Sequence, residues 1–187
     1  MTDWYILQAE QFRAADGYAV SEMGLSVPEL MERAADGLYK GCVDLCGESL
    51  KKIPVTFLCG KGNNGGDGFC LCARLAEEGY DVAAIAVFGT GELSGAAAEM
   101  ASRVPENCLI NLVCETGESL AYQRIACSGL VVDCVFGTGF SGVLSEEIQR
   151  LFAAVQGKKI LACDLPSGVS CDGGQVSPGA LKADKTI

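Results

Sequence analysis

The chain has 187 residues, of which 49% are hydrophobic and 20% charged, a composition that suits a folded domain with a substantial core and excludes a disordered chain. Its net charge of −10 disfavours binding to bare nucleic acid or to an anionic membrane, because both need a basic face. No apolar run approaches the roughly 18 to 20 residues of a membrane span, so we expect neither nucleic acid nor membrane as a partner.

The sequence contains eleven cysteines and no histidine. The cysteines are odd in number and lie mostly in apolar runs, and no secretory leader is evident, which indicates reduced thiols in a cytoplasmic protein. Zinc is not expected, because the cysteine spacings do not fit a zinc site and no histidine can complete one. Without histidine, Ser-His-Asp and Cys-His mechanisms are excluded, so acid–base chemistry must come from other side chains or bound water.

The first fifty residues predict two helices. The second helix has a clear start, because Ser26 and Glu29 form a capping box and Pro28 lies in the first turn. The apolar positions at helical spacing are Ile6, Phe12 and Ala15 in the first helix, and Leu30, Met31, Ala34, Ala35 and Leu38 in the second.

From residue 53 onward, apolar runs of strand length alternate with helical patterns. Strands that are apolar on both faces are typical of a parallel sheet covered by helices on both sides. The predicted fold class is therefore α/β: a three-layer αβα sandwich with a Rossmann-like, doubly wound, mostly parallel sheet and two N-terminal helices, in one domain over residues 1–187. Strands are expected at 53–59, 82–88, 109–113, 130–136 and 160–163, and helices at 69–78, 94–103, 119–127 and 146–155.

Three segments should lie at the carboxyl ends of strands, where such folds bind their ligands. The first, residues 60–68, reads GKGNNGGDG and is expected to be a loop that leads into a helix. Five glycines in nine residues let the backbone approach a ligand, and the helix N-terminus behind them favours a phosphate. The spacing matches neither the dinucleotide fingerprint nor a P-loop. The alternative is a glycine-rich turn with an Asp near the helix start.

The second segment, residues 133–143, begins with Asp133 inside an apolar strand. A carboxylate there is costly unless it meets a cation or several hydrogen-bond donors, and the alternative is a structural Asp that caps backbone amides. The glycines at 137, 139 and 142 match Gly-x-Gly-x-x-Gly, a weak signal when it stands alone.

The third segment follows the strand at 160–163 and reads DLPSGV. Asp164 ends this strand and is well placed to act on a ligand, while Pro166 and Gly168 fix the turn that presents Ser167. The alternative is a strand-end turn with Asx-type hydrogen bonds. Together the three segments supply a phosphate cradle, two carboxylates and hard oxygen ligands for a cation from Asn64, Asp133 and Ser167.

These motifs resemble the NAD(P)HX epimerase family, also called the YjeF N-terminal domain family. The resemblance rests on Gly60-x-Gly-Asn-Asn-Gly-Gly-Asp-Gly68, Asp133-x-x-Phe-Gly-Thr-Gly139 and Asp164-x-Pro-Ser-Gly168, and extends to residues 25–34 and 182–186. It implies an isomerase that interconverts the R and S epimers of hydrated NADH and NADPH (NADHX and NADPHX), which are substrates rather than cofactors, in the repair of nicotinamide cofactors.

The resemblance also implies roles for individual residues. Asp164 would be the catalytic acid–base group, and Asn64, Asp133 and Ser167 would bind one potassium ion per subunit. The residues that would bind the substrate are Asn63, Asn64, Gly65, Gly66, Asp67, Gly137, Thr138, Gly139, Phe140, Ser141, Gly142, Val143 and Asp164.

Two features depart from the family pattern. Some members carry a Lys after the second strand that has been proposed to act with the Asp, whereas residues 87–92 read VFGTGE here. The family also continues past Ile187 into a further strand, so we expect a C-terminally truncated domain. The resemblance implies a homodimer and a fused or separate NAD(P)HX dehydratase as partners.

Two other functions compete with the epimerase. One is a catalytically weak module of the same fold that binds a nucleotide or a protein. The other is a generic Rossmann dehydrogenase, which the sequence disfavours because the first strand is not followed by Gly-x-Gly-x-x-Gly and no acidic residue ends the second strand to hold a ribose.

Overall fold

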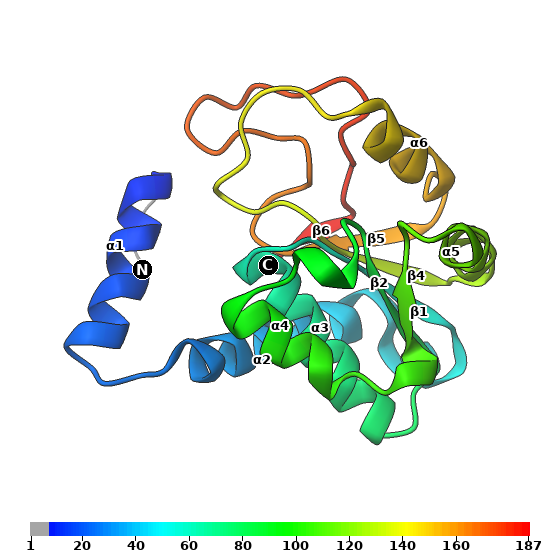
Figure 1. Cartoon of the computed structure of the whole chain (residues 1–187), viewed down its shortest axis with the longest axis horizontal. Coiled ribbons are helices and arrows are strands. Elements are labelled where there is room, and N and C mark those ends of the chain that lie inside the picture. Colours follow the sequence, from blue (N-terminus) through cyan, green and yellow to red (C-terminus); the bar gives the residue numbers. More distant parts are fainter. Residues whose placement is uncertain (1–7) are drawn as a thin grey trace.

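The computed structural model describes residues 8–187, which are built around a six-stranded parallel sheet (Figure 1). The strand order is β3-β2-β1-β4-β5-β6. The chain adds β2 and β3 on one side of β1 and then β4, β5 and β6 on the other, so the strand order reverses between β1 and β4, as in doubly wound folds. Every pair of neighbouring strands is parallel. The strands are β1 (Val55–Cys59), β2 (Val82–Ala86), β3 (Leu109–Asn111), β4 (Leu130–Cys134), β5 (Lys159–Ala162) and β6 (Lys185–Thr186).

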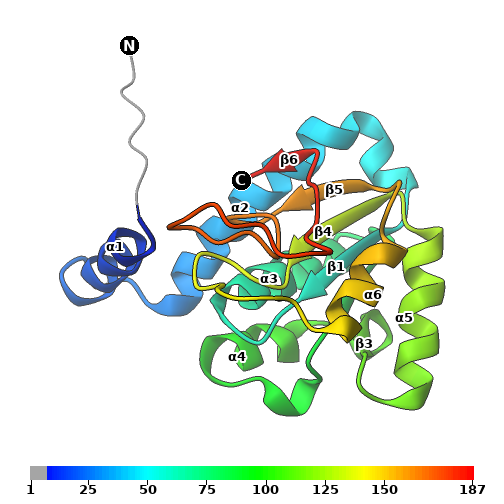
Figure 2. The ribbon, with the colours of Figure 1, turned by 90° about the horizontal axis from the view of Figure 1, so that it is seen from above.

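Helices cover both faces of the sheet, which confirms the predicted three-layer α/β sandwich (Figure 2). One core lies between the sheet and the helices α2 (Val27–Cys46), α3 (Asn63–Glu77) and α4 (Gly95–Arg103). The other lies between the sheet and the helices α5 (Glu115–Cys127) and α6 (Glu146–Ala154). Strands β1, β2 and β4 are buried along their whole length, which explains why their sequences are apolar without alternation.

The predicted first helix is α1 (Ala9–Ser21), which stands apart from the sheet in both views (Figures 1 and 2). Ala9 is its one buried residue, and the backbone N–H of Ala9 donates to Asp172 Oδ1 at 2.9 Å. Phe12 and Tyr18 are exposed. Ile6, which was expected to begin the apolar stripe, lies outside the described residues. The helix therefore has little core of its own.

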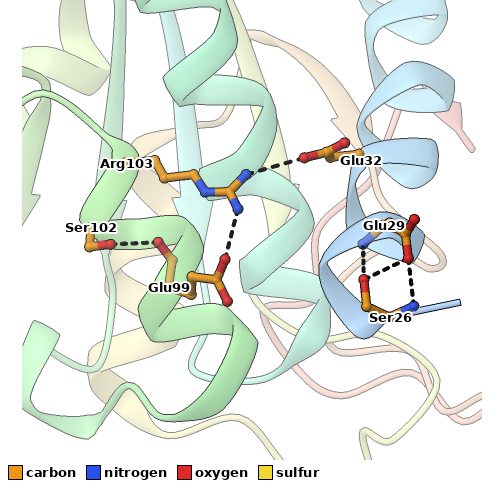
Figure 3. A network of polar contacts seen from close by, with 6 residues as sticks. All are labelled: Ser26, Glu29, Glu32, Glu99, Ser102 and Arg103. Atoms are coloured by element: carbon orange, nitrogen blue, oxygen red, sulfur yellow. Dashed lines mark hydrogen bonds and ion pairs between the residues drawn. The ribbon is translucent and has the colours of Figure 1, made fainter. Parts of the chain in front are cut away.

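Helix α2 begins with the predicted capping box (Figure 3). The backbone N–H of Ser26 donates to the Glu29 carboxylate at 2.7 Å, and Ser26 Oγ accepts from the backbone N–H of Glu29 at 3.3 Å. Arg103, on α4, reaches Glu32 on α2 at 3.2 Å and Glu99 on its own helix at 2.7 Å. This exposed network joins the two neighbouring helices above the first core.

Several predicted boundaries were wrong. Helix α3 begins at Asn63 rather than at residue 69, so only residues 60–62 of the predicted glycine-rich loop precede the helix. Helix α5 begins four residues earlier than expected, and the strands β1, β2, β3 and β4 are shorter than their apolar runs. Glycine and asparagine are poor helix formers, which hid the true start of α3.

Within residues 8–187, every helix is too short or too polar to span a bilayer. Short 3₁₀ turns lie at Gly47–Lys52, Thr90–Glu92 and Glu106–Cys108.

Candidate functional site

The carboxyl ends of β1, β4 and β5 open onto a cavity of about 670 Å³. The segments that follow β4 and β5, yellow and orange in Figure 1, lie beside one another above this edge of the sheet. The fold thus brings parts of all three sequence-predicted segments into one place. The predicted site residues among its walls are Asn63, Asn64, Gly137, Thr138, Gly139, Phe140, Ser141, Val143 and Asp164.

A second cavity of about 480 Å³ adjoins the first on the side of α1 and α2. Its apolar wall comes from the two helices, and its polar wall includes Asp67. The two cavities share Asp16, Asn63, Asn64, Thr138 and Asp164. Asp164 therefore lies where the two cavities meet, so its carboxylate could contact a molecule bound in either cavity.

Asp164 has an unusual backbone conformation. Among residues 8–187 it is the only non-glycine residue with a positive φ, at 61°, and such strain is concentrated at functional sites. Its backbone N–H donates to the carbonyl of Ile187 at 2.8 Å, and a Cβ on Gly137 would come within 2.6 Å of its Oδ2. Although solvent reaches the carboxylate through the cavities, the concave wall desolvates it, and this together with the charge of Asp16 raises its pKa.

Asp67 lies nearby on α3 and is half-buried. Its Oδ2 is 4.0 Å from the Sγ of Cys163, the residue that precedes Asp164. Burial, followed by the negative charges of Asp164 and Asp16, raises the pKa of Asp67 to about 8. At neutral pH the protonated form of Asp67 therefore predominates over the anion.

Asp133 is fully buried at the end of β4 and is bonded directly to Ser167. One carboxylate oxygen accepts from Ser167 Oγ at 2.6 Å and from the backbone N–H of Val135 at 3.2 Å, and the other accepts from the backbone N–H of Ser167 at 2.7 Å. Burial raises the pKa of Asp133 to about 6, and these hydrogen bonds limit the rise. The carboxylate thus ties the segment after β4 to the segment after β5.

Asn64 has an unsatisfied side chain. It is 8% exposed, and neither its Oδ1 nor its Nδ2 has a hydrogen-bond partner among the described residues. A buried amide in this condition is costly unless a ligand completes it. Its Cγ lies near Gly137, as does the carboxylate of Asp164. Asn64 therefore points to a bound group at this edge of the sheet.

The oxygens of Asn64, Asp133 and Ser167 suit a hard cation such as potassium, because amide, carboxylate and hydroxyl oxygens are donors that such ions accept. In residues 8–187 no group of three or more His, Cys, Asp or Glu side chains could hold a metal ion. A cation here would accordingly depend on Asn and Ser, and its set of donors is unlike that of a zinc site.

The glycines of α3 serve packing. A Cβ on Gly65 would lie 2.0 Å from the carbonyl oxygen of Gly60, and one on Gly66 would lie 2.5 Å from Met31 Cε. Both glycines are buried, and neither belongs to the cavity walls. Gly142, which has a positive φ of 94°, is also outside those walls. Contacts of these three residues with a substrate stay predictions.

The walls also include residues that were not predicted from the sequence. Arg13 and Asp16 come from α1, and Phe88 follows β2. Phe88 could have been found from its place at the end of the predicted strand 82–88, because the carboxyl ends of parallel strands share one edge. Nothing in the pattern of α1 distinguishes Arg13 or Asp16 from ordinary exposed residues.

Comparisons with known proteins place the chain in a family. The family described as YjeF-related protein N-terminus matches residues 27–187. A protein named NAD(P)H-hydrate epimerase from Clavibacter michiganensis subsp. michiganensis is 37% identical over 190 residues, which cover 92% of this chain and 79% of that protein. The bifunctional NAD(P)H-hydrate repair enzyme Nnr of Coxiella burnetii is 34% identical, and the match covers 97% of this chain and 36% of that protein.

A solved structure shares the fold. The crystal structure of yeast ynu0 superposes with a TM-score of 0.80, covering 98% of this chain and 79% of that one, at 21% sequence identity. At this identity the likeness concerns the arrangement of strands and helices.

Proposed function

This chain belongs to the family of YjeF-related N-terminal domains, and we propose that it is an NAD(P)H-hydrate epimerase. Two relatives with that name are similar to this chain over most of their own length. It would interconvert the R and S epimers of NADHX and NADPHX. The observation that carries the proposal is the strained Asp164 at the end of β5, facing two joined cavities beside the glycine-rich segment after β4.

The chemistry requires a proton and a stabilised cation. The epimerised carbon bears a hydroxyl group and is bonded to the ring nitrogen, so loss of the hydroxyl as water leaves an iminium-like cation. Addition of water to the other face, with loss of a proton, gives the opposite epimer. The Asp164 side chain would transfer the proton, and its carboxylate would stabilise the cation. The raised pKa of Asp164 brings its proton affinity closer to neutral pH and so favours this role.

The rest of the substrate would lie along the first cavity. The first N–H groups of α3, at Asn63 and Asn64, come before the first hydrogen bond of the helix, which Gly66 N–H donates to Gly62 O. These two N–H groups would bind a phosphate of the substrate. The segment from Gly137 to Val143 would form the opposite wall. Lys61 also lines this cavity and adds a positive charge, although it lies 3.6 Å from Glu92 in an exposed ion pair.

Potassium would be held by Asn64, Asp133 and Ser167. Bound there, the ion would supply positive charge to a buried carboxylate and complete the unpartnered amide of Asn64. The ion would thereby stabilise the two segments that Asp133 joins, including the wall that faces the substrate. Omitting potassium from the assay should lower activity or substrate affinity.

A coupled assay tests the proposal. The protein is mixed with the R hydrate and a dehydratase that consumes only the S form, and recovery of reduced cofactor is followed. We expect acceleration above spontaneous epimerisation, and a loss of roughly a hundredfold or more in Asp164→Asn, which keeps the shape but not the proton transfer. A folded Asp164→Asn variant with the wild-type rate would remove Asp164 from the mechanism.

The same assay separates the epimerase from a binding-only module. Residues 87–92 lack the Lys that some family members carry, which argues against a two-residue Asp–Lys mechanism and so favours the weaker alternative. No acceleration by the wild-type protein would support that alternative. A dehydratase that acts on the S epimer would be the functional partner, and the eleven free thiols fit a cytoplasmic, reducing location.

A further inference from the structure

A third cavity, of about 490 Å³, lies on the same edge of the sheet but beyond β1, at the ends of β2 and β3. Its floor is apolar and includes Val87, Leu112 and Val113, which follow those two strands. Tyr122 on α5 and Arg150 on α6 flank it. None of these residues has a role in the reaction proposed above.

This third cavity adjoins the first. The two share Phe88, Ser145 and Ile148. Aromatic rings mark the connection: the ring of Phe88 lies 5.8 Å from that of Phe136, which lies 5.0 Å from that of Phe140. An elongated ligand could therefore extend from Asp164 along this aromatic path into the space between α5 and α6.

The strand order indicates what such a ligand would place there. Doubly wound sheets bind dinucleotides across the point where the strand order reverses, so that the two halves lie on opposite sides of it. Here the reversal falls between β1 and β4. Asp164 follows β5, on one side, and the third cavity follows β2 and β3, on the other.

We propose that the cavity between α5 and α6 binds the adenosine half of the hydrated dinucleotide. The inference rests on the proposed function and names a second half-site for the same substrate. The apolar floor and the Tyr122 ring would contact the adenine, because purines bind to apolar and aromatic surfaces. The carboxylate of Glu118, which also lines the cavity, would accept hydrogen bonds from ribose or amino groups.

Arg150 gives the cavity a further property. It is exposed, and its Nη2 is 3.9 Å from the Glu147 carboxylate, a weak contact that leaves the guanidinium available. A guanidinium suits the extra phosphate that distinguishes NADPHX from NADHX. Arg150→Glu should therefore raise the KM for NADPHX more than the KM for NADHX.

A half-molecule substrate tests the assignment. Tyr122→Ala is assayed with NADHX and with the hydrate of reduced nicotinamide mononucleotide, which lacks the adenosine half. Loss of an aromatic contact with a base should raise the KM for NADHX roughly tenfold, with kcat little changed. The KM for the mononucleotide hydrate should stay at the wild-type value, because that substrate does not reach the third cavity.

Two further variants complete the test. Val113→Glu places a charge on the apolar floor at a side chain that is 66% exposed, so it answers the same question if Tyr122→Ala does not fold. Leu120→Ala changes another exposed position of α5, outside the cavity, and should behave as wild type. The inference would be overturned if the cavity variants raised the KM equally for both hydrates, or if neither variant changed the KM for NADHX. A wild-type protein inactive on both hydrates would instead refute the proposed function.

Discussion

Asp67 is held in a state that an acidic residue avoids in water. Its neighbours include Asp16 and Asp164, both negatively charged when ionised, and no Lys or Arg forms an ion pair with it in the part of the chain that the structure describes. Each unit by which the pKa rises costs about 1.4 kcal/mol of folding free energy at a pH where the unfolded chain is ionised. A carboxyl group kept protonated beside a cavity is typical of sites that trade stability for function.

Replacing this carboxyl group should stabilise the protein in a pH-dependent way. Below about pH 4 the folded and unfolded states both carry the proton, so Asp67→Asn should have little effect. Between about pH 4 and the folded pKa of about 8 the unfolded state loses the proton first, so wild-type stability falls as pH rises. We expect Asp67→Asn to be more stable than wild type by about 2 to 4 kcal/mol at pH 7.5.

Urea unfolding at pH 4 and pH 7.5 measures this difference. Asp36→Asn is a suitable control, because Asp36 is exposed in an ion pair with Arg74 on the surface. The control should change stability by less than about 1 kcal/mol at either pH. A difference between Asp67→Asn and wild type that is the same at both pH values would show that ionisation of Asp67 is not its cause.

Some residues of the candidate site could be predicted from the sequence and others could not. Asp133, Asp164 and Ser167 could be selected because each interrupts an apolar strand or follows it, a place where a polar residue needs a reason. The hydrogen bonds between Asp133 and Ser167 confirm that the segment after β4 meets the segment after β5. Arg13 and Asp16 could not be selected, because a residue on an exposed helix gains its place in a cavity only through tertiary packing.

Helix α3 shows what element patterns can and cannot predict. The alternation of apolar runs and helical stripes was sufficient for the layers and for the parallel sheet. The start of α3 was missed because intrinsic propensity disfavours glycine there, whereas tertiary contact requires it. Gly65 and Gly68 allow the helix to approach the neighbouring backbone at Gly60 and the thiols of Cys59 and Cys134. Packing thus overrides propensity at this position.

Gly65→Ala tests this explanation of α3. The added Cβ would lie 2.0 Å from the Gly60 carbonyl oxygen, and because this neighbour is backbone it cannot move like a flexible side chain. We expect a loss of about 2 to 3 kcal/mol in unfolding free energy. The matched control is Gly62→Ala, where no atom lies within 4 Å and φ is −96°. If chemical denaturation gives both variants the same stability, close approach is not why glycine occupies position 65.

In the whole molecule, α1 belongs to the cavities more than to the core. It contributes Phe12, Asp16 and Val20 to the wall of the second cavity, while Ala9 is its one buried residue. The sheet and the helices α2 to α6 enclose both core clusters without it. Helix α1 therefore contributes to the binding site without contributing to either core cluster.

Removing residues 1–24 should therefore affect binding more than stability. Because α1 adds little buried apolar surface, we expect the unfolding free energy of the remaining residues to fall by no more than about 1 to 2 kcal/mol. Loss of the α1 wall should raise the KM for the hydrated dinucleotide several-fold, since the cavity beside Asp164 would then be open to water. Thermal unfolding and the coupled assay give the two values. A large loss of stability with an unchanged KM would show that α1 serves the core, and would remove Asp16 from the binding site.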